Sequence, residues 1–399
     1  MRILFVAMAN SVHTAGWVSQ LADTGWDIHV FDAMEGSLIP ELKGVTAYTY
    51  YRPLKTACNV KKVYSILPLP RGIGFLCHRL KLMRSFFMPS RIDSLTRLIK
   101  HLKPDILHSL EMQHESYPLL EVKRRLGGKF LMPWIYSSWG SDLYLFGEQK
   151  EHQARIKEVL ASCDYYIADC QRDIEIAARL GFKGDEVGVF PGAGGFDIAG
   201  MRTWIKPGRI SKRRVIALKG YSGWAGRAIV ALHALQLCAD ILQDYKVVVY
   251  SADAEIEHVA RYVSRVTNIP FEVFPRSPRD EIIKLMGRSR IAIGMSISDG
   301  TPNAMLDAMV MGAFPIQSDT VSTAEWIILG ENGLLVPPED PVALAAAIRQ
   351  ALSDDRLVDN AARKNARIAA ERLDRSVIQT QIVAMYEKVV AQSKQHSAQ

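Results

Sequence analysis

The chain lacks the features of a membrane-spanning or disulfide-bonded protein. No apolar run in its 399 residues approaches the roughly 20 residues that a membrane-spanning helix requires. Its five cysteines are an odd number without Cys-x-x-Cys spacing, which is typical of reduced, mostly buried thiols in a cytosolic protein. We also find no internal repeat and no low-complexity segment. With 48% hydrophobic and 23% charged residues, the composition is that of a soluble globular protein.

Two further absences concern ligand sites. The first polar loop, Asn10–Gly16, has no Gly-x-Gly-x-x-Gly fingerprint of dinucleotide binding. His108 and His114 have no third ligand at a suitable local spacing, so we predict no metal site. The apolar start Met1–Ala9 is barely at the lower limit for a signal peptide and precedes a periodic helix, which favours a first strand.

Positive charge is concentrated in one segment. Residues 52–103 contain twelve Lys or Arg and one acid, Asp93, so this segment carries +11 while the whole chain carries +7. Within it, Phe75–Met88 mixes large apolar residues with cations, which predicts contact with an anionic membrane surface. The alternative is a helix packed on its domain with the cations in water. No nucleic-acid motif accompanies the segment, so we do not expect nucleic acid as a partner.

The length and the order of elements predict two α/β domains. A chain of 399 residues is too long for one ordinary core. The strand Arg2–Ala9, the loop Asn10–Gly16, a helix from Val18 and the strand Ile28–Phe31 form a Rossmann-type start. A second start of this kind begins with the strand Val215–Leu218 and is followed by a helix from about residue 228.

The most informative stretch is Ser298–Glu325. The apolar run Ile291–Ile297 before it is short enough to be a buried strand. Thr301 can then cap a helix, Pro302 suits the first turn, and a glycine at 312 can end it. A helix N-terminus gathers unpaired backbone N–H groups, so the corner formed by Gly300, Thr301, Pro302 and Asn303 suits a phosphate or sugar hydroxyls.

Two acids bracket this corner. Asp299 precedes the helix and Asp307 lies in its early turns, with seven residues between them. Both can face one crevice, and a pair of carboxylates can hold the hydroxyls of a sugar and a ribose. The alternative is a solvated loop acid together with a helix acid that complements the macrodipole.

The longer pattern resembles a known family. The string Asp299-Gly-Thr-Pro-Asn-(x)3-Asp-Ala-Met, then Gly312-Ala-Phe-Pro-Ile, Gly330-Glu-Asn-Gly-Leu-Leu-Val-Pro and Ala343–Ile348, is similar to retaining glycosyltransferases of the GT-B fold. It most resembles the family 4-like enzymes, also called glycosyl transferases group 1. That family carries two Glu residues at this spacing, and both are Asp here.

The resemblance implies a domain organisation. We expect two Rossmann-like domains that face each other across a cleft, in an α/β fold. Residues 1–205 would form an acceptor-binding domain and residues 206–374 a nucleotide-sugar donor domain. Helix 375–399 would return to the first domain, and the glycine-rich stretch Pro191–Asp197 would act as a hinge between the two.

The resemblance also implies catalytic residues. Lys219 and Arg227 would hold the donor diphosphate, with two surface cations as the alternative. Asp299 would bind sugar hydroxyls and Asp307 the ribose. His13 would lie in a loop near the reacting sugar, although a loop histidine is often merely exposed.

Further donor contacts are implied around the same pocket. Relatives show His-Gly-x-Asp where this chain has Trp139-Gly-Ser-Asp, and Asp142 is alternatively a loop-closing or helix-capping acid. Arg276 would stack on the nucleobase. Glu325 would point either to the ribose or to backbone. The predicted donor-binding residues are Asp307, Gly300, Thr301, Pro302, Asn303, Glu325, Arg276, Gly140, Ser141 and Asp142.

These features together predict a retaining glycosyltransferase that moves a sugar from a nucleotide-diphosphate donor to a hydroxyl of a glycan or lipid-linked acceptor. We expect a role in cell-surface polysaccharide or glycoconjugate synthesis, no tightly bound cofactor, and a cytoplasmic position that is peripheral at the membrane. The first alternative is a nucleotide-sugar epimerase of the same fold. The second is a non-catalytic glycan-binding or membrane-binding protein.

Overall fold

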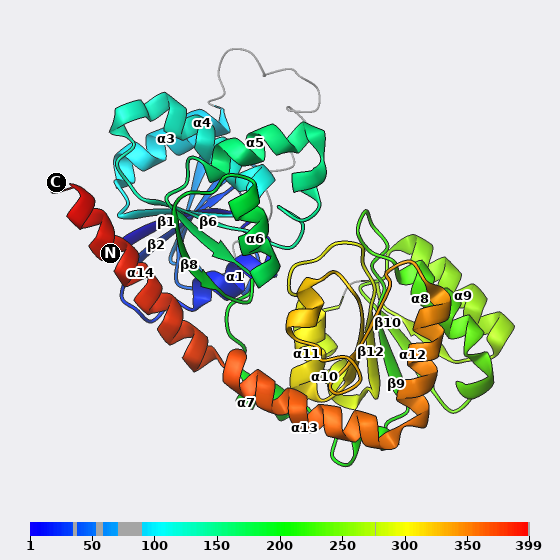
Figure 1. Cartoon of the computed structure of the whole chain (residues 1–399). Coiled ribbons are helices and arrows are strands. Elements are labelled where there is room, and N and C mark those ends of the chain that lie inside the picture. The colour runs from blue at the N-terminus through cyan, green and yellow to red at the C-terminus, as the bar shows by residue number, and fades with distance from the viewer. Residues whose placement is uncertain (35–37, 53–58, 71–89, 276, 398–399) are drawn as a thin grey trace. The chain divides into compact units, whose positions relative to one another are not determined.

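The structure is a computed structural model that describes residues 1–34, 38–52, 59–70, 90–275 and 277–397. The chain divides into two compact units. Unit 1 contains Met1–Gly195 and Arg375–Gln399, and unit 2 contains Phe196–Asp374 (Figure 1). We describe each unit by itself.

Unit 1 is built on an eight-stranded sheet of parallel strands in the order β4-β3-β2-β1-β5-β6-β7-β8. The central strands are buried along their whole length, which is expected when helices cover both faces of a parallel sheet. The strands are β1 (Arg2–Ala7), β2 (Asp27–Asp32), β3 (Thr46–Arg52), β4 (Lys62–Pro70), β5 (Ile106–Leu110), β6 (Trp134–Ser137), β7 (Tyr165–Ala168) and β8 (Asp185–Val189).

Two helix layers cover this sheet (Figure 1). One face packs against α1 (Val12–Ser19) and the long C-terminal helix α14 (Arg375–Ser397). The other face packs against a larger group of helices. That group comprises α3 (Arg91–Leu102), α4 (Tyr117–Leu126), α5 (Lys150–Leu160) and α6 (Gln171–Arg179).

Unit 2 has a six-stranded parallel sheet in the order β11-β10-β9-β12-β13-β14. In sequence order this is 3-2-1-4-5-6, the order of the Rossmann fold. The strands are β9 (Val215–Lys219), β10 (Lys246–Tyr250), β11 (Phe271–Val273), β12 (Ile291–Gly294), β13 (Phe314–Ser318) and β14 (Leu334–Val336).

Helices also lie on both faces of the second sheet (Figure 1). One face packs against α8 (Ala228–Leu237), α9 (Ala254–Thr267) and α12 (Pro341–Ser353). The opposite face packs against α7 (Ile198–Arg202), α10 (Arg279–Arg288), α11 (Asn303–Met311) and part of α13 (Asp355–Arg372). The predicted α/β class with two Rossmann-like halves is therefore confirmed.

The division between the units lies at Gly195, whereas the sequence placed it at residue 205. Phe196 already belongs to unit 2, because its N–H donates to the carbonyl of Leu373 at 2.7 Å and it bridges to Asp374. The C-terminal helix belongs to unit 1: Ile382, Tyr386 and further residues of α14 are part of its core.

Two local predictions are corrected. The predicted polar loop with His13 is shorter, because α1 begins at Val12 and Ser11 is its N-cap, accepting a hydrogen bond from the His13 N–H at 3.2 Å. Thr301 does not cap α11, whose N-cap is Pro302. The Thr301 hydroxyl instead accepts a hydrogen bond from Trp326 Nε1 at 3.3 Å.

Two sequence predictions fall on residues that the structure does not describe. Arg276, predicted at the nucleobase, is one of these residues. The basic apolar stretch Phe75–Met88 also lies outside the described ranges. Of the helices that are described, none combines the length and apolar character needed to cross a membrane.

Candidate functional site

The candidate donor residues of unit 2 lie at the carboxyl edge of its sheet. β9 ends at Lys219 and β12 ends at Gly294, and these two strands are hydrogen-bonded neighbours. The strand order reverses between them, because β10 follows on the far side of β9 and β13 on the far side of β12. Ligands of open α/β sheets bind at such a switch point, so this edge is the first candidate for a binding site.

Backbone hydrogen bonds join the loops that follow β9 and β12. The N–H of Arg227 donates to the carbonyl of Met295, and the N–H of Ile297 donates to the carbonyl of Ala225, both at 2.9 Å. Gly226 is required at this crossing, because a β-carbon there would lie 2.1 Å from the carbonyl oxygen of Tyr221. The loop that carries Arg227 and the loop that leads to Asp299 therefore have a fixed relative position.

Lys219 and Asp299 both act electrostatically on Tyr221. The Lys219 ammonium lies 6.0 Å from the ring centroid. Burial raises the pKa of Tyr221, and the negative charges of Asp299 and Asp253 raise it further. Lys219 and Asp299 are each partly buried, and neither forms an ion pair with another residue in the described ranges. Both charges therefore remain available to a ligand.

Arg227 has a partner in this structure. Its Nε lies 2.8 Å from Oε1 of Glu339, and its Nη1 donates to the carbonyl of Gly226 at 2.9 Å. The side chain of Glu339 is 65% exposed, which makes this a solvated ion pair of modest strength. An anion that approaches Arg227 competes with Glu339.

Asp307 differs from Asp299 in burial and in its partner. Its carboxylate is almost fully buried and accepts two hydrogen bonds from Arg279, at 2.7 and 3.1 Å. Burial raises the pKa of Asp307 and Arg279 opposes this shift, so the net direction is upward. The two acids that the sequence pairs by spacing thus have different environments, and the ribose role of Asp307 stays a prediction.

The corner between Asp299 and α11 is supported from within the unit. Ser322 Oγ donates to the carbonyl of Gly300 at 2.7 Å. Glu325 ends the short 3-10 helix Ser322–Glu325, and its carbonyl accepts a hydrogen bond from Arg372 at 2.9 Å. Gly300, Thr301 and Pro302 are buried, whereas Asn303 and Glu325 are partly exposed. Asp299 and the predicted donor-binding residues 300 to 303 therefore share one supported corner.

In unit 1, His13 and Trp139 are brought together. Their ring centroids are 5.7 Å apart at an interplanar angle of 55°. His13 follows the end of β1 and Trp139 follows the end of β6, so both lie at the carboxyl edge of the first sheet. Trp139 stands where relatives have a histidine. Its ring lies next to the imidazole of His13, which is the predicted catalytic residue of this region.

Asp142 closes the turn in which it lies. Its Oδ2 accepts hydrogen bonds from the Trp139 N–H at 3.0 Å and from the Tyr136 hydroxyl at 3.1 Å. Burial and the negative charge of Glu111 raise the pKa of Asp142 well above its usual range. This geometry fits the loop-closing alternative, and a contact of Asp142 with a donor sugar stays a prediction.

Gly140 and Ser141 are positioned by the same turn. The Gly140 N–H donates to Asp169 at 3.4 Å, and its carbonyl accepts from Arg172 at 3.3 Å. Gly140 has a φ of 60°, a conformation that favours glycine. Ser141 is partly buried.

Two groups of described side chains have the spacing of metal ligands. They are Glu111, His114 and Glu115, and Asp169, Cys170 and Asp173, with the ligand atoms of each group within 4.8 Å of one another. In the second group, Asp173 already pairs with Arg172 at 2.8 Å, and burial raises the pKa of the Cys170 thiol. That group is therefore an ion pair beside a protonated thiol.

In the first group, the carboxyl groups of Glu111 and Glu115 lie next to each other. Glu115 is fully buried, and neither of its oxygens accepts a hydrogen bond from a described residue. Burial and the adjacent Glu111 raise the pKa of Glu115 well above its usual range, and the pKa of Glu111 is lowered by hydrogen bonds with Glu115 and His114 although burial opposes this. A protonated Glu115 that donates to an ionised Glu111 satisfies both groups.

Sequence reasoning missed Arg279, Glu339 and Tyr221. Arg279 and Glu339 lie 28 and 112 positions from the residues that they contact, so no local spacing relates them. Tyr221 lies within the predicted loop from Lys219 to Arg227, and an aromatic residue beside a predicted cation was the available signal. The order of the parallel strands brings the partners of each pair together.

The geometry defines a class of protein with two Rossmann-like units whose polar residues gather at the carboxyl edges of the sheets. Two family models match the chain. Residues 223–354 match the model for glycosyl transferases group 1, and residues 70–169 match the model for glycosyl transferase 4-like proteins. A comparison with curated proteins found no significant match.

Several solved structures share the fold. HepE from Anabaena in complex with UDP is 16% identical, with a TM-score of 0.68, over 97% of this chain and 100% of that chain. Sucrose-phosphate synthase from Thermosynechococcus elongatus is 15% identical, with a TM-score of 0.69, over 98% and 100%. A glycosyltransferase from Rickettsia africae is 13% identical, with a TM-score of 0.66, over 98% of each chain.

The two parallel sheets with interleaved helices are those of GT-B glycosyltransferases. The family-model matches and this fold together support a glycosyltransferase of the GT-B type.

Proposed function

We propose that the protein transfers a sugar from a nucleotide-diphosphate donor, with retention of anomeric configuration, to a hydroxyl of a glycan or lipid-linked acceptor. The observation that carries this proposal is the carboxyl edge of the second sheet. There Lys219 and the loop to Asp299 meet at the switch point, and neither side chain has an ion-pair partner among the described residues.

In this proposal the chain supplies charge rather than a nucleophile. Lys219 and Arg227 stabilise the negative charge that develops on the departing diphosphate, and Arg227 exchanges its contact with Glu339 for a phosphate oxygen. Asp299 accepts hydrogen bonds from sugar hydroxyls and so orients the reacting carbon. The acceptor attacks from the face that the diphosphate leaves, and a phosphate oxygen takes its proton.

Further parts of the proposal rest on the sequence and on relatives. UDP is the first nucleotide to test, because UDP and UDP-glucose are named for the HepE structures. We place the reaction in cell-surface polysaccharide or glycoconjugate synthesis at the cytoplasmic face of the membrane. The basic segment 52–103 supports the membrane contact.

Donor binding and turnover test this proposal. A panel of nucleotide sugars is screened by thermal shift, and slow hydrolysis of each binding donor is then followed by NMR, which also reports the anomer released. We expect Lys219→Ala and Asp299→Asn to lower turnover by about 100-fold or more, as loss of one group that stabilises charge in a transition state does. Full activity in both variants would remove the site assignment.

Matched controls lie at the opposite edge of the same sheet. Lys246→Ala and Asp244→Asn make the same charge changes next to the start of β10, and Asp244 is exposed. They are expected to leave turnover unchanged. Conversion of the donor sugar to its epimer without an acceptor would instead establish the epimerase alternative.

A further inference from the structure

Unit 2 contains a cavity that is separate from the candidate donor edge. It has a volume of about 630 Å³ and is formed by the segment before β9, the end of α11 and the first half of α13. Met311 and Gly312 come just before β13, and Ser211 comes just before β9. The cavity therefore lies at the amino edge of the sheet, whereas Lys219 and Asp299 lie at the carboxyl edge.

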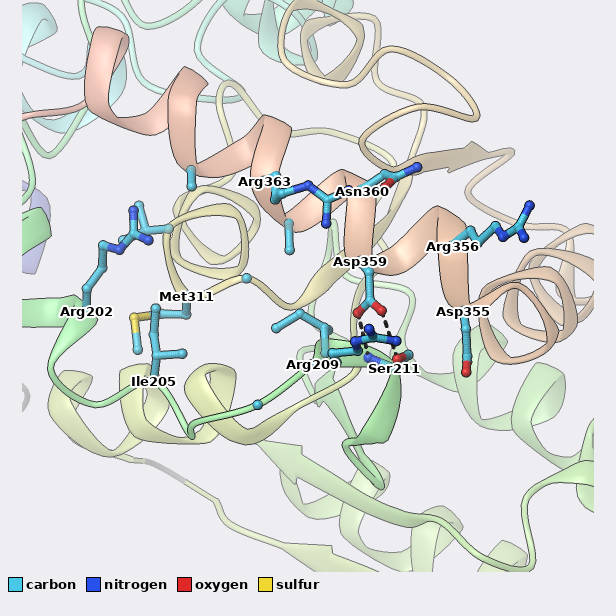
Figure 2. Close-up of a pocket in the computed structure, with 16 residues that line it drawn as sticks. Arg202, Ile205, Arg209, Ser211, Met311, Asp355, Arg356, Asp359, Asn360 and Arg363 are labelled. Carbon is cyan, nitrogen blue, oxygen red and sulfur yellow. Dashed lines mark hydrogen bonds between the residues drawn. The ribbon is translucent and has the colours of Figure 1, made fainter.

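Four arginines line this cavity (Figure 2). Arg202 and Arg209 come from the segment before β9, and Arg356 and Arg363 come from α13. All four side chains belong to exposed residues, and none of them forms an ion pair with a residue in the described ranges. Arg363 donates a hydrogen bond to the neutral amide of Asn360.

The two acids of the cavity are already engaged. Both oxygens of Asp359 accept hydrogen bonds from Ser211, one from the N–H and one from the hydroxyl, each at 3.0 Å (Figure 2). Asp355 pairs with Arg290 at 2.8 Å and with Lys212 at 3.7 Å. Asp355 already has two cationic partners, and the one remaining carboxylate, Asp359, cannot balance four arginines, so the lining keeps a net positive charge.

The remaining wall is apolar. Ile205, Ile210, Val310 and Met311 line the cavity together with small alanines of α13. A concave site of this volume, with an apolar wall and a few polar groups, has the dimensions of small-molecule pockets. Guanidinium groups bind phosphate through two parallel hydrogen bonds, which makes arginine the side chain suited to a phosphorylated ligand.

We propose that this cavity binds a small phosphorylated molecule that carries at least two negative charges and an organic body. The arginines hold the phosphates and the apolar wall contacts the body. The ligand is separate from the donor nucleotide, because the cavity lies at the opposite edge of the sheet. Binding weakens with salt, since the arginines are open to solvent.

Titration with fructose 1,6-bisphosphate tests this site. The compound has two phosphates and no nucleoside. Isothermal titration of the full chain is expected to show binding that falls at least about tenfold in the Arg209→Gln, Arg356→Gln double variant. The exposed arginines have no ion-pair partner in the described part of the chain, so the double variant is expected to fold, which its melting temperature and circular dichroism check.

A control variant and a competitor locate the binding. Arg367→Gln removes one positive charge, half of what the double variant removes, at a position of α13 that does not line the cavity, and it is expected to change the affinity by less than about twofold. Saturating UDP is expected to leave the titration unchanged. Hydrogen exchange is expected to slow in residues 202–211 and 355–366 when the bisphosphate binds.

Three results would overturn the proposal. The first is no detectable binding of the bisphosphate, or equal loss of binding in the control. The second is displacement of the bisphosphate by UDP, which would place it at the donor edge. The third is loss of binding to phosphatidylglycerol vesicles in the double variant without bisphosphate binding by the wild type, which would make the arginines a membrane surface.

Discussion

Arg279 holds the buried carboxylate of Asp307 with two parallel hydrogen bonds, at 2.7 and 3.1 Å. Arg279 begins α10 and Asp307 lies within α11, so the pair ties two helices on the same face of the second sheet. The guanidinium also lies 5.2 Å from the ring centroid of Phe196. The side chain of Arg279 is 37% exposed and that of Asp307 only 4%, so the two partners depend on the pair unequally.

Removing one partner of this pair is expected to cost more stability than removing the other. Arg279→Met leaves a buried carboxylate without a counter-charge and should cost about 3 kcal/mol, the lower end of the usual range because the arginine is partly solvated. Asp307→Asn leaves a partly exposed cation and should cost about 1 kcal/mol. Urea unfolding of each variant, with hydrogen exchange measured in α11, gives both free-energy costs. Equal costs would contradict the unequal burial.

The Arg279→Met variant should also depend on pH. The pKa of Asp307 is already raised by burial against the opposing effect of Arg279, and removing Arg279 should raise it further. When the pKa of a carboxyl is higher in the folded state than in the unfolded state, the protein loses stability as the pH rises above the unfolded pKa. It regains that stability as the pH falls. Unfolding at pH 5 should therefore show a smaller deficit for the variant than unfolding at pH 8.

Glu339 is expected to weaken anion binding at Arg227. The ion pair at 2.8 Å must open before a phosphate oxygen reaches the guanidinium. Exposed pairs contribute about 0.2–1 kcal/mol, so Glu339→Gln should tighten UDP binding by no more than about fivefold. Titration calorimetry measures this, with Glu331→Gln, another exposed acid of the same unit, as the control. Weaker UDP binding in Glu339→Gln would show that the carboxylate has a different role.

A buried chain of hydrogen bonds attaches α14 to unit 1. Trp17 Nε1 donates to the Tyr386 hydroxyl at 2.9 Å, the hydroxyl lies 2.6 Å from His108 Nδ1, and His108 Nε2 lies 2.7 Å from Ser137 Oγ. Donation of the Tyr386 hydroxyl proton to Nδ1, with the His108 proton on Nε2, gives every group of this chain a partner. Tyr386→Phe is expected to destabilise unit 1 by about 2 kcal/mol, because it leaves two buried groups without partners.

His108 should make the stability of unit 1 depend on pH. Complete burial lowers its pKa from 6.5 to about 3. Between these values the unfolded chain binds a proton that the folded chain does not, so stability falls by about 1.4 kcal/mol per unit as pH decreases through this window. In His108→Gln, the slope of the free energy of unfolding against pH should be smaller by the amount that corresponds to about one bound proton. An unchanged slope would mean that this histidine is not neutral and buried.

Glu115 should make the stability of unit 1 depend on pH in the direction opposite to that of His108. Its raised pKa means that the folded unit holds a proton that the unfolded chain releases, so stability decreases as pH rises above about 4.5. Glu115→Gln keeps a donor for Glu111 and removes the titration, and it should stabilise the protein at pH 8 by about 1 kcal/mol with little effect at pH 4. Glu121→Gln, at a partly exposed position of α4, is the control. A loss of stability at pH 8 would contradict the shared proton.

Local patterns were sufficient for the order of strands and loops and for the end of α11, but not for the starts of α1 and α11. The short apolar run at 291, the acids at 299 and 307 and the helix end at Gly312 are encoded within neighbouring residues, and α11 does end at Gly312 in the left-handed conformation. The predicted strand Val215–Leu218, followed by Lys219 and a loop, likewise defines the carboxyl edge of β9. Backbone geometry and burial repeat over a few residues, so one sequence is enough to predict them.

The environment of each site residue was decided by tertiary structure. Asp299 and Asp307 have the same side chain, yet one lacks an ion-pair partner among the described residues and the other is buried against Arg279. Asp142 closes its own turn, and Arg227 contacts a glutamate that follows β14. Such contacts join residues far apart in the chain, and the free energy of a charge depends on the groups and the solvent around it. The sequence by itself determined which residues gather at the sheet edge, and only the packing of the whole unit decided which charges were left for a ligand.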